Sequence, residues 1–151
     1  MTKELEANRQ NLYETDYLKW IDTTIENLRL QDYSNIDWEN LIEEIEAMGR
    51  SERRSLKSNL IVLVTHLLKW QYQPEFRSGS WKGSIVEHRR RIREALFCSP
   101  SLKPYLEEVF AGCYVDAVEQ ASAETGLPLE TFPQECPYTC AEVLNSNFFS
   151  E

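Results

Sequence analysis

Apolar residues recur at intervals of three and four along most of the chain, which is the period expected of amphipathic α-helices. A first helix is predicted to begin after Thr15 or Asp16, and a second after Asp37, because these side chains commonly cap helix N-termini. Gly49 fits the left-handed position that ends many helices. The apolar stripes expected to face the core are Tyr17, Leu18, Ile21, Ile25 and Leu28 in the first helix, and Trp38, Leu41, Ile42, Ile45 and Met48 in the second.

The most apolar segment of the chain follows. It extends from a cap at Ser51 to about Tyr72, and its apolar residues cover more than one face, which predicts the central helix of the fold. Gln73 ends this helix, because a residue before a proline, here Pro74, is pushed out of the α region. A fourth helix is predicted from Ser80, with one apolar face and an opposite face rich in arginine.

The last third of the chain predicts two more helices with an extended segment between them. Ser99 and Pro100 can open a fifth helix, which we expect to end near Gly126. Residues 127–137 contain three prolines and are expected to be extended and packed. Thr139 can then cap a short last helix.

No segment alternates between apolar and polar residues as a strand would. We therefore predict an all-α, single-domain up-and-down bundle of four to five helices over residues 13–151, with residues 1–12 flexible. A chain of 151 residues can bury a proper core without metal or disulfide staples. The sequence has no apolar signal region and no membrane-length apolar stretch, so we expect a cytoplasmic protein whose four cysteines are reduced thiols.

Charge is unevenly distributed along the chain. Net charge is −9, yet the segment from Arg50 to Lys103 holds twelve Lys or Arg and four Glu, a net charge of +8, so the rest carries −17. An acidic whole disfavours non-specific binding of nucleic acid. The basic middle is compatible with a local anion site, or with basic helices that face the acidic ones, and we favour the second interpretation.

Several longer motifs resemble a known family. They span Tyr13–Tyr17, Asp37–Ile45, Gly49–Arg54, His66–Pro74, Ser99–Leu102 and Thr125–Thr139. Together they resemble the bacterial, largely cyanobacterial, domain-of-unknown-function family twenty-nine, from about Tyr13 to Phe148. The resemblance implies a small helical domain that stands alone as a whole protein. It implies no activity, and it therefore brings no catalytic residues to this sequence.

The best candidate for a binding site is the polar cluster in the basic middle. Its residues are Arg50, Arg53, Arg54, His66, Lys69, Gln73, Arg77, Arg89, Arg90 and Arg93, with Glu43 and Glu44 as acidic members. Guanidinium groups suit bidentate binding of phosphate or carboxylate, which makes the cluster a candidate anion or acidic-peptide pocket. The alternative, which we favour, pairs these arginines with the glutamates of the second helix, namely Glu39, Glu43, Glu44 and Glu46.

Candidate catalytic groups are few. His66 and His88 are the only imidazoles, and each is explained more simply as a core histidine than as an acid–base catalyst. Cys136 and Cys140 could form half of a zinc site, but no second pair has ligand spacing. The sequence has no nucleophile elbow and no glycine-rich phosphate loop, so we predict no catalytic residue, no metal and no cofactor.

These observations favour a non-enzymatic interaction or regulatory module, whose acidic part would bind an unidentified and basic protein partner. Self-association as a homodimer is compatible with the helical pattern. The alternative is a nucleic-acid-binding or metal-assisted nuclease-like protein that uses the basic middle helices. A further alternative is a small-ligand pocket between helices, which would show as an apolar cavity with a few polar groups.

Overall fold

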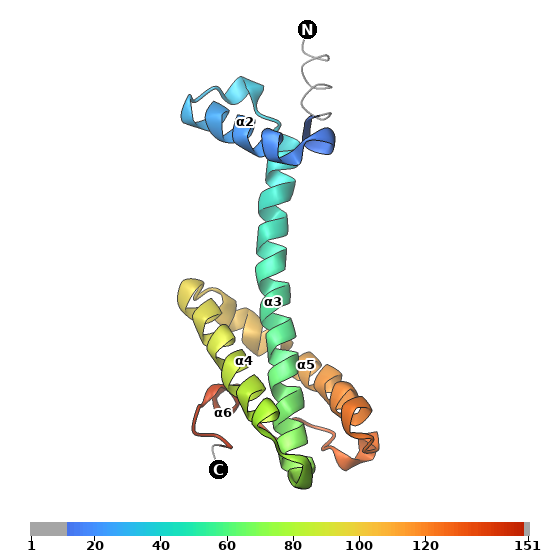
Figure 1. Ribbon diagram of the computed structural model, residues 1–151. Helices are drawn as coiled ribbons and strands as arrows, with labels where there is room; N and C mark the ends of the chain where they lie inside the picture. Colours follow the sequence, from blue (N-terminus) through green and yellow to red (C-terminus); the bar gives the residue numbers. More distant parts are fainter. Residues whose placement is uncertain (1–11, 150–151) are drawn as a thin grey trace. The chain divides into compact units, whose positions relative to one another are not determined.

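The computed structural model describes residues 12–149, and this range contains helices and no β-strand (Figure 1). The prediction of an all-α helical bundle is confirmed. The elements are α2 (Tyr17–Arg29), η1 (Tyr33–Asn35), α3 (Trp38–Tyr72), η2 (Pro74–Phe76), α4 (Gly79–Cys98), α5 (Leu102–Thr125), η3 (Leu129–Thr131) and α6 (Cys140–Leu144). Within residues 12–149, no helix is both long enough and apolar enough to cross a membrane.

Contacts divide the chain into two compact units, Met1–Arg50 and Ser51–Glu151, with α3 contributing residues to both. The prediction of one domain over residues 13–151 stays a prediction. The segment predicted to be flexible, residues 1–12, lies outside the described residues except for Leu12, which is helical.

Helix α2 of the N-terminal unit begins as the sequence predicts. The Asp16 side chain accepts a 3.1 Å hydrogen bond from the Lys19 amide, so this carboxylate is the N-cap. The predicted apolar stripe of α2 is wrong, because Trp20 and Thr24 are the buried residues of the helix. Four members of that stripe are exposed, namely Tyr17, Leu18, Ile25 and Leu28. The aromatic ring of Trp20 buries more area than any of them, which explains why it sets the inner face.

Helix α3 corrects the prediction of two separate helices. It is continuous from Trp38 to Tyr72, and both Gly49 and Ser51 lie inside it. Among the described glycines only Gly126 has a positive φ, so Gly49 keeps an ordinary helical backbone. A glycine costs a helix only about 1 kcal/mol, and the neighbouring Glu, Ala, Met and Arg residues favour helix, so the weak stop signal is overridden.

The C-terminal unit has a core built around the second half of α3. Figure 1 shows α4 beside this part of α3 and α5 crossing behind it, with successive helices running in alternate directions. The fully buried large side chains include Leu56, Leu60, Leu63, Leu67 and Leu68 from α3, Ile92 from α4 and Leu106 from α5. Each such side chain contributes about 1.5–3 kcal/mol when it leaves water, so this segment is central to the fold, as predicted.

Helices α4 and α5 begin close to their predicted starts. The cap of α4 is Ser78, whose hydroxyl accepts from the Trp81 amide, rather than Ser80. The cap of α5 is Ser101, after a turn at Ser99 and Pro100, and its side chain makes no capping hydrogen bond. Gly126 ends α5 in a left-handed conformation with φ of 76°, as the sequence predicts.

Residues 127–139 are irregular apart from η3 and lead into the short helix α6. Thr139 caps α6 through a capping box in which Thr139 and Glu142 exchange side-chain-to-backbone hydrogen bonds. Val143 is fully buried, which fixes α6 to the core. The four cysteines are free thiols, as predicted, and Cys98 is exposed on the last turn of α4.

Candidate functional site

An exposed apolar stripe runs along the first turns of α3, in the N-terminal unit. Trp38, Ile42, Ile45 and Met48 follow each other at intervals of three and four, so they share one side of the helix. Their exposed fractions are 47%, 53%, 58% and 63% in this order. The sequence assigned these residues to the core, and their exposure corrects that prediction. A contiguous exposed apolar stripe is typical of an interaction surface.

Carboxylates accompany the apolar stripe. Glu39, Glu43 and Glu46 are exposed and occur at intervals of four and three on α3, so they form a second row along the same helix. We call the two rows together the acidic apolar face. Residues 12–50 as a whole contain ten Asp or Glu and three Lys or Arg, a net charge of −7. This net charge attracts positively charged groups in solution.

Arg50 and Glu44 contribute to the electrostatics of this unit in different ways. Arg50 forms ion pairs with Glu43 at 3.0 Å and with Glu46 at 3.8 Å, and all three side chains are more than half exposed. Glu44 instead accepts hydrogen bonds from the hydroxyls of Tyr13 and Tyr17. These bonds hold the pKa of the Glu44 carboxyl below its ordinary value and raise that of Tyr13 to about 12.

Three arginines of the predicted cluster bind backbone carbonyls instead of glutamates. Arg89 is buried, and its Nε and one terminal nitrogen each donate a 2.8 Å hydrogen bond, to the carbonyls of Val143 and Phe148 respectively. Arg93 donates to the carbonyl of Leu144. The two arginines thus satisfy carbonyls at and beyond the C-terminal end of α6, where the helix provides no partner.

Arg77 has the same kind of role at the end of α3. Its Nε donates a 2.8 Å hydrogen bond to the carbonyl of Trp70, and its guanidinium lies 4.9 Å from the centre of the Trp70 ring. Gln73 follows the last turn of α3, and its backbone amide donates to the carbonyl of Lys69.

The buried Arg89 keeps its positive charge. Burial lowers the pKa of its guanidinium, and the charge of Arg93 lowers it further, but the ordinary pKa of arginine is so high that the group stays protonated.

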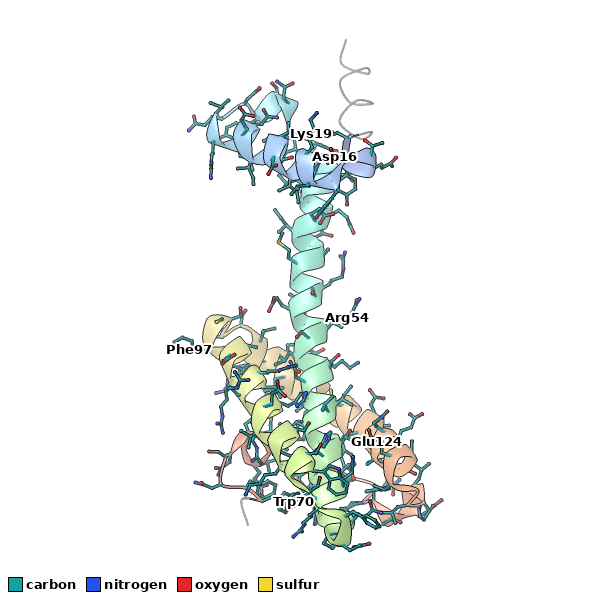
Figure 2. The ribbon with its side chains drawn as sticks, viewed as in Figure 1. Asp16, Lys19, Arg54, Trp70, Phe97 and Glu124 are labelled. Carbon is teal, nitrogen blue, oxygen red and sulfur yellow. The ribbon has the colours of Figure 1, made fainter. Side chains whose placement is uncertain are left out.

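The other predicted cations are on exposed surfaces. Arg53 and Arg54 are exposed on α3, and Figure 2 labels Arg54 on that helix. Arg90 is exposed on α4 and lies 3.6 Å from Glu94. The structure therefore separates the predicted cluster into cations that hold the C-terminal unit together and cations that face water.

His66 lines a pocket of about 290 Å³ between α3 and α5, together with Glu124, which is the ion-pair partner of Lys69. Lys69 is buried and lies 3.4 Å from Glu124 of α5, with its ammonium 4.6 Å from the centre of the Trp81 ring. His66 Nδ1 is 2.8 Å from the carbonyl of Val62. Because a carbonyl oxygen can only accept, Nδ1 carries a proton in this contact.

Burial is the main cause that lowers the pKa of the His66 imidazole, and the charge of Lys69 adds to it. The sequence did not predict Glu124 as the ion-pair partner of Lys69, because the two residues are 55 positions apart and no local pattern links them. His88 on α4 makes the same kind of contact as His66, since its Nδ1 is 2.7 Å from the carbonyl oxygen of Ser84, four residues earlier. Within the described residues 12–149, no group of three or more His, Cys, Asp or Glu could hold a metal ion.

Comparison with protein families gives one match. The family model described as "Domain of unknown function DUF29" matches residues 12–149. The search of curated proteins and the search of solved structures each found no match.

Proposed function

Since the chain belongs to the family described as domain of unknown function DUF29, whose description assigns no activity, we propose a function from its surface: the protein is a non-enzymatic interaction module whose acidic apolar face binds a basic, amphipathic helical segment of a partner protein. The observation that carries the proposal is the exposure of the apolar stripe beside the row of carboxylates on α3.

The apolar stripe supplies the affinity. Ile42, Ile45 and Met48 are each more than half exposed, so a partner that covered them would remove much apolar surface from water. Their spacing is that of one helix face, which matches the apolar face of a second amphipathic helix. Trp38 extends the stripe, and its ring nitrogen already donates to the carbonyl of Tyr33, so the ring is held in place for contact.

The carboxylates supply the selectivity. An acidic partner helix would be repelled by Glu39, Glu43 and Glu46, because like charges would be brought together. A partner helix with Lys or Arg beside its apolar face would be attracted by the same carboxylates. This argument also opposes a second copy of the same face, since residues 12–50, which include the face, carry a net charge of −7 in each copy. The occupant is therefore a basic partner.

The alternative, a nucleic-acid-binding or nuclease-like protein, has less support from the arrangement of the basic middle. Arg77, Arg89 and Arg93 donate to backbone carbonyls, which leaves them fewer hydrogens for phosphate oxygens. We accordingly place the interaction on the acidic side of the protein.

The test uses two synthetic amphipathic peptides of about 18 residues, long enough to form helix, with the same leucine positions and either lysine or glutamate elsewhere. Isothermal titration calorimetry of the full chain should show binding of the lysine peptide and no binding of the glutamate peptide. Binding should weaken as salt is raised. The double variant Ile42→Ser, Ile45→Ser should bind at least about tenfold more weakly.

The matched control is Val86→Ser on α4, because Val86 is 58% exposed, as Ile45 is. This variant should bind the lysine peptide like the unchanged protein. Circular dichroism confirms that each variant keeps its helices. Equal binding of the two peptides, or equal loss in the control, would contradict the proposal.

A further inference from the structure

The C-terminal unit contains a groove of about 800 Å³ between α5 and the segment that follows it. Tyr114, Val115 and Val118 line one wall, and Leu129 and Phe132 line the other. This volume lies within the range of small-molecule sites. The groove belongs to neither the acidic apolar face nor the pocket at His66, which are formed by other residues.

Both walls of the groove are fixed by contacts that do not depend on a ligand. The hydroxyl of Tyr114 donates to the carbonyl of Pro133. Ser122 donates a 2.6 Å hydrogen bond to the carbonyl of Leu127, which holds the start of the second wall against α5. Phe132 is buried and meets the Tyr72 ring edge to face, with ring centres 5.4 Å apart. A preformed groove of this kind binds without first having to order its walls.

Two of the residues that line the groove are exposed aliphatic side chains on opposite walls. Val115 on α5 and Leu129 on η3 line the groove and are 64% and 54% exposed. Two aliphatic side chains left in water on opposite walls lose that exposure when an apolar body lies between them.

The charged groups of the groove are all of one sign. Glu119 and Glu130 line it, Gln134 adds a neutral amide, and none of the described residues that line it is Lys, Arg or His. A carboxylate ligand is repelled by this arrangement, while a ligand with an ammonium group is attracted.

We propose that this groove is a binding site for organic amines, in which an apolar body lies between Val115 and Leu129 and a protonated amine lies against Glu119 and Glu130. The proposal is independent of the proposed partner-binding function, because it concerns other residues in the other unit. It makes the C-terminal unit a receptor for a small cationic ligand.

Three probes that share one apolar body test the proposal: 4-phenylbutylamine, 4-phenylbutanol and 4-phenylbutyrate. They are titrated into the isotope-labelled full chain, and amide shifts are followed by NMR. The amine should move the amides of residues 114–119 and 129–134 and bind tightest, the alcohol should bind at least about tenfold more weakly, and the acid should not bind there. Equal binding of all three, tighter binding of the acid, or no shift in these residues would overturn the proposal.

A matched pair of variants separates the local carboxylates from net charge. Glu119→Gln with Glu130→Gln should weaken the amine at least about tenfold. Glu107→Gln with Glu108→Gln removes the same charge from exposed positions on α5 and should leave amine binding within twofold of the unchanged protein. All four residues are exposed, so both variants are expected to fold, and circular dichroism checks this. Equal weakening in the two pairs would contradict a site at Glu119 and Glu130.

Discussion

Arg89 Nε donates a 2.8 Å hydrogen bond to the carbonyl oxygen of Val143, a residue 54 positions later in the chain. Arg89 is only 3% exposed and Val143 is fully buried, so this contact joins α4 to α6 away from water. In the sequence, Arg89 belongs to an arginine-rich segment that resembles an anion-binding site. In the structure, its guanidinium instead stabilises the packing of α6 against α4. The contact also gives the most direct test of how the C-terminal unit is held together.

Replacement of Arg89 by alanine should lower the free energy of unfolding by about 3–6 kcal/mol, because hydrogen bonds from charged groups contribute about 1.5–3 kcal/mol each and the carbonyls of Val143 and Phe148 both lose their donor. Urea denaturation measures the change. Arg90→Ala is the control, since Arg90 is exposed and its ion pair with Glu94 is worth at most about 0.5 kcal/mol. Similar losses in both variants would argue against the structural role of Arg89.

Two glycines of one helix should respond to alanine in opposite directions. Gly112 is exposed inside α5 with nothing within 4 Å of an added Cβ, so Gly112→Ala should stabilise the protein by about 0.5–1 kcal/mol. Gly126 has equal space but a φ of +76°, so Gly126→Ala should destabilise it by about 1 kcal/mol. Thermal unfolding of the two variants gives the signs, and a gain at Gly126 would exclude the left-handed helix end.

The hydrogen bonds from Tyr13 and Tyr17 to Glu44 predict a pH dependence. The pKa of Glu44 is lowered in the folded protein, so its stabilising contribution is present at neutral pH and is lost as the pH falls through that lowered pKa. The pKa of Tyr13 is raised to about 12, so the contribution of its hydroxyl is lost as the pH rises through about 12.

The variant Tyr13→Phe tests this arrangement. It removes the larger of the two causes that lower the Glu44 pKa, so NMR titration of the Glu44 side chain should show a pKa closer to its ordinary value. Tyr33→Phe is the control, because the Tyr33 ring lies beside Trp38 and its hydroxyl is not among the groups that bond Glu44. An unchanged Glu44 titration in Tyr13→Phe would contradict the hydrogen bond.

Thiol labelling should distinguish the cysteines by exposure. Cys98 is exposed and should react first with iodoacetamide in the folded protein. Cys113 is buried, and burial raises the pKa of its thiol, so it should react only when the protein unfolds. Burial also raises the pKa of Cys140 to about 11, which predicts slow labelling at neutral pH. Mass spectrometry after timed labelling gives the order, and early loss of the Cys113 thiol would contradict its burial.

The sequence predicts the helical class well because its strongest signals are local. The predicted cap at Thr15 or Asp16, the end of α3 before Pro74 and the left-handed Gly126 depend on neighbours within a few residues. The structure confirms the last two and shows that Asp16 is the cap. The spacing of apolar residues alone does not show whether an apolar stripe packs against another part of the chain. The stripe at Ile42 and Ile45 has helical spacing but stays exposed, and only tertiary contacts could reveal this.

The candidate binding residues were harder to predict for a similar reason. Arg89 and Arg93 look like any exposed basic run, and their backbone acceptors lie more than 50 residues away. Glu124, the partner of Lys69, is equally distant. The groove between α5 and η3 depends on how Phe132 and Pro133 fold back, which no periodic pattern encodes.

The carboxylates beside the exposed stripe on α3 also affect how the protein behaves alone in solution. Colloidal stability depends on the balance between apolar attraction and charge repulsion, and here both come from one helix segment around Ile42 and Glu43. At low ionic strength the repulsion extends about 30 Å at 0.01 M salt and keeps copies apart, whereas at 1 M it extends only about 3 Å. Salting the protein out should therefore begin at this segment, and a concentrated stock keeps best in dilute buffer.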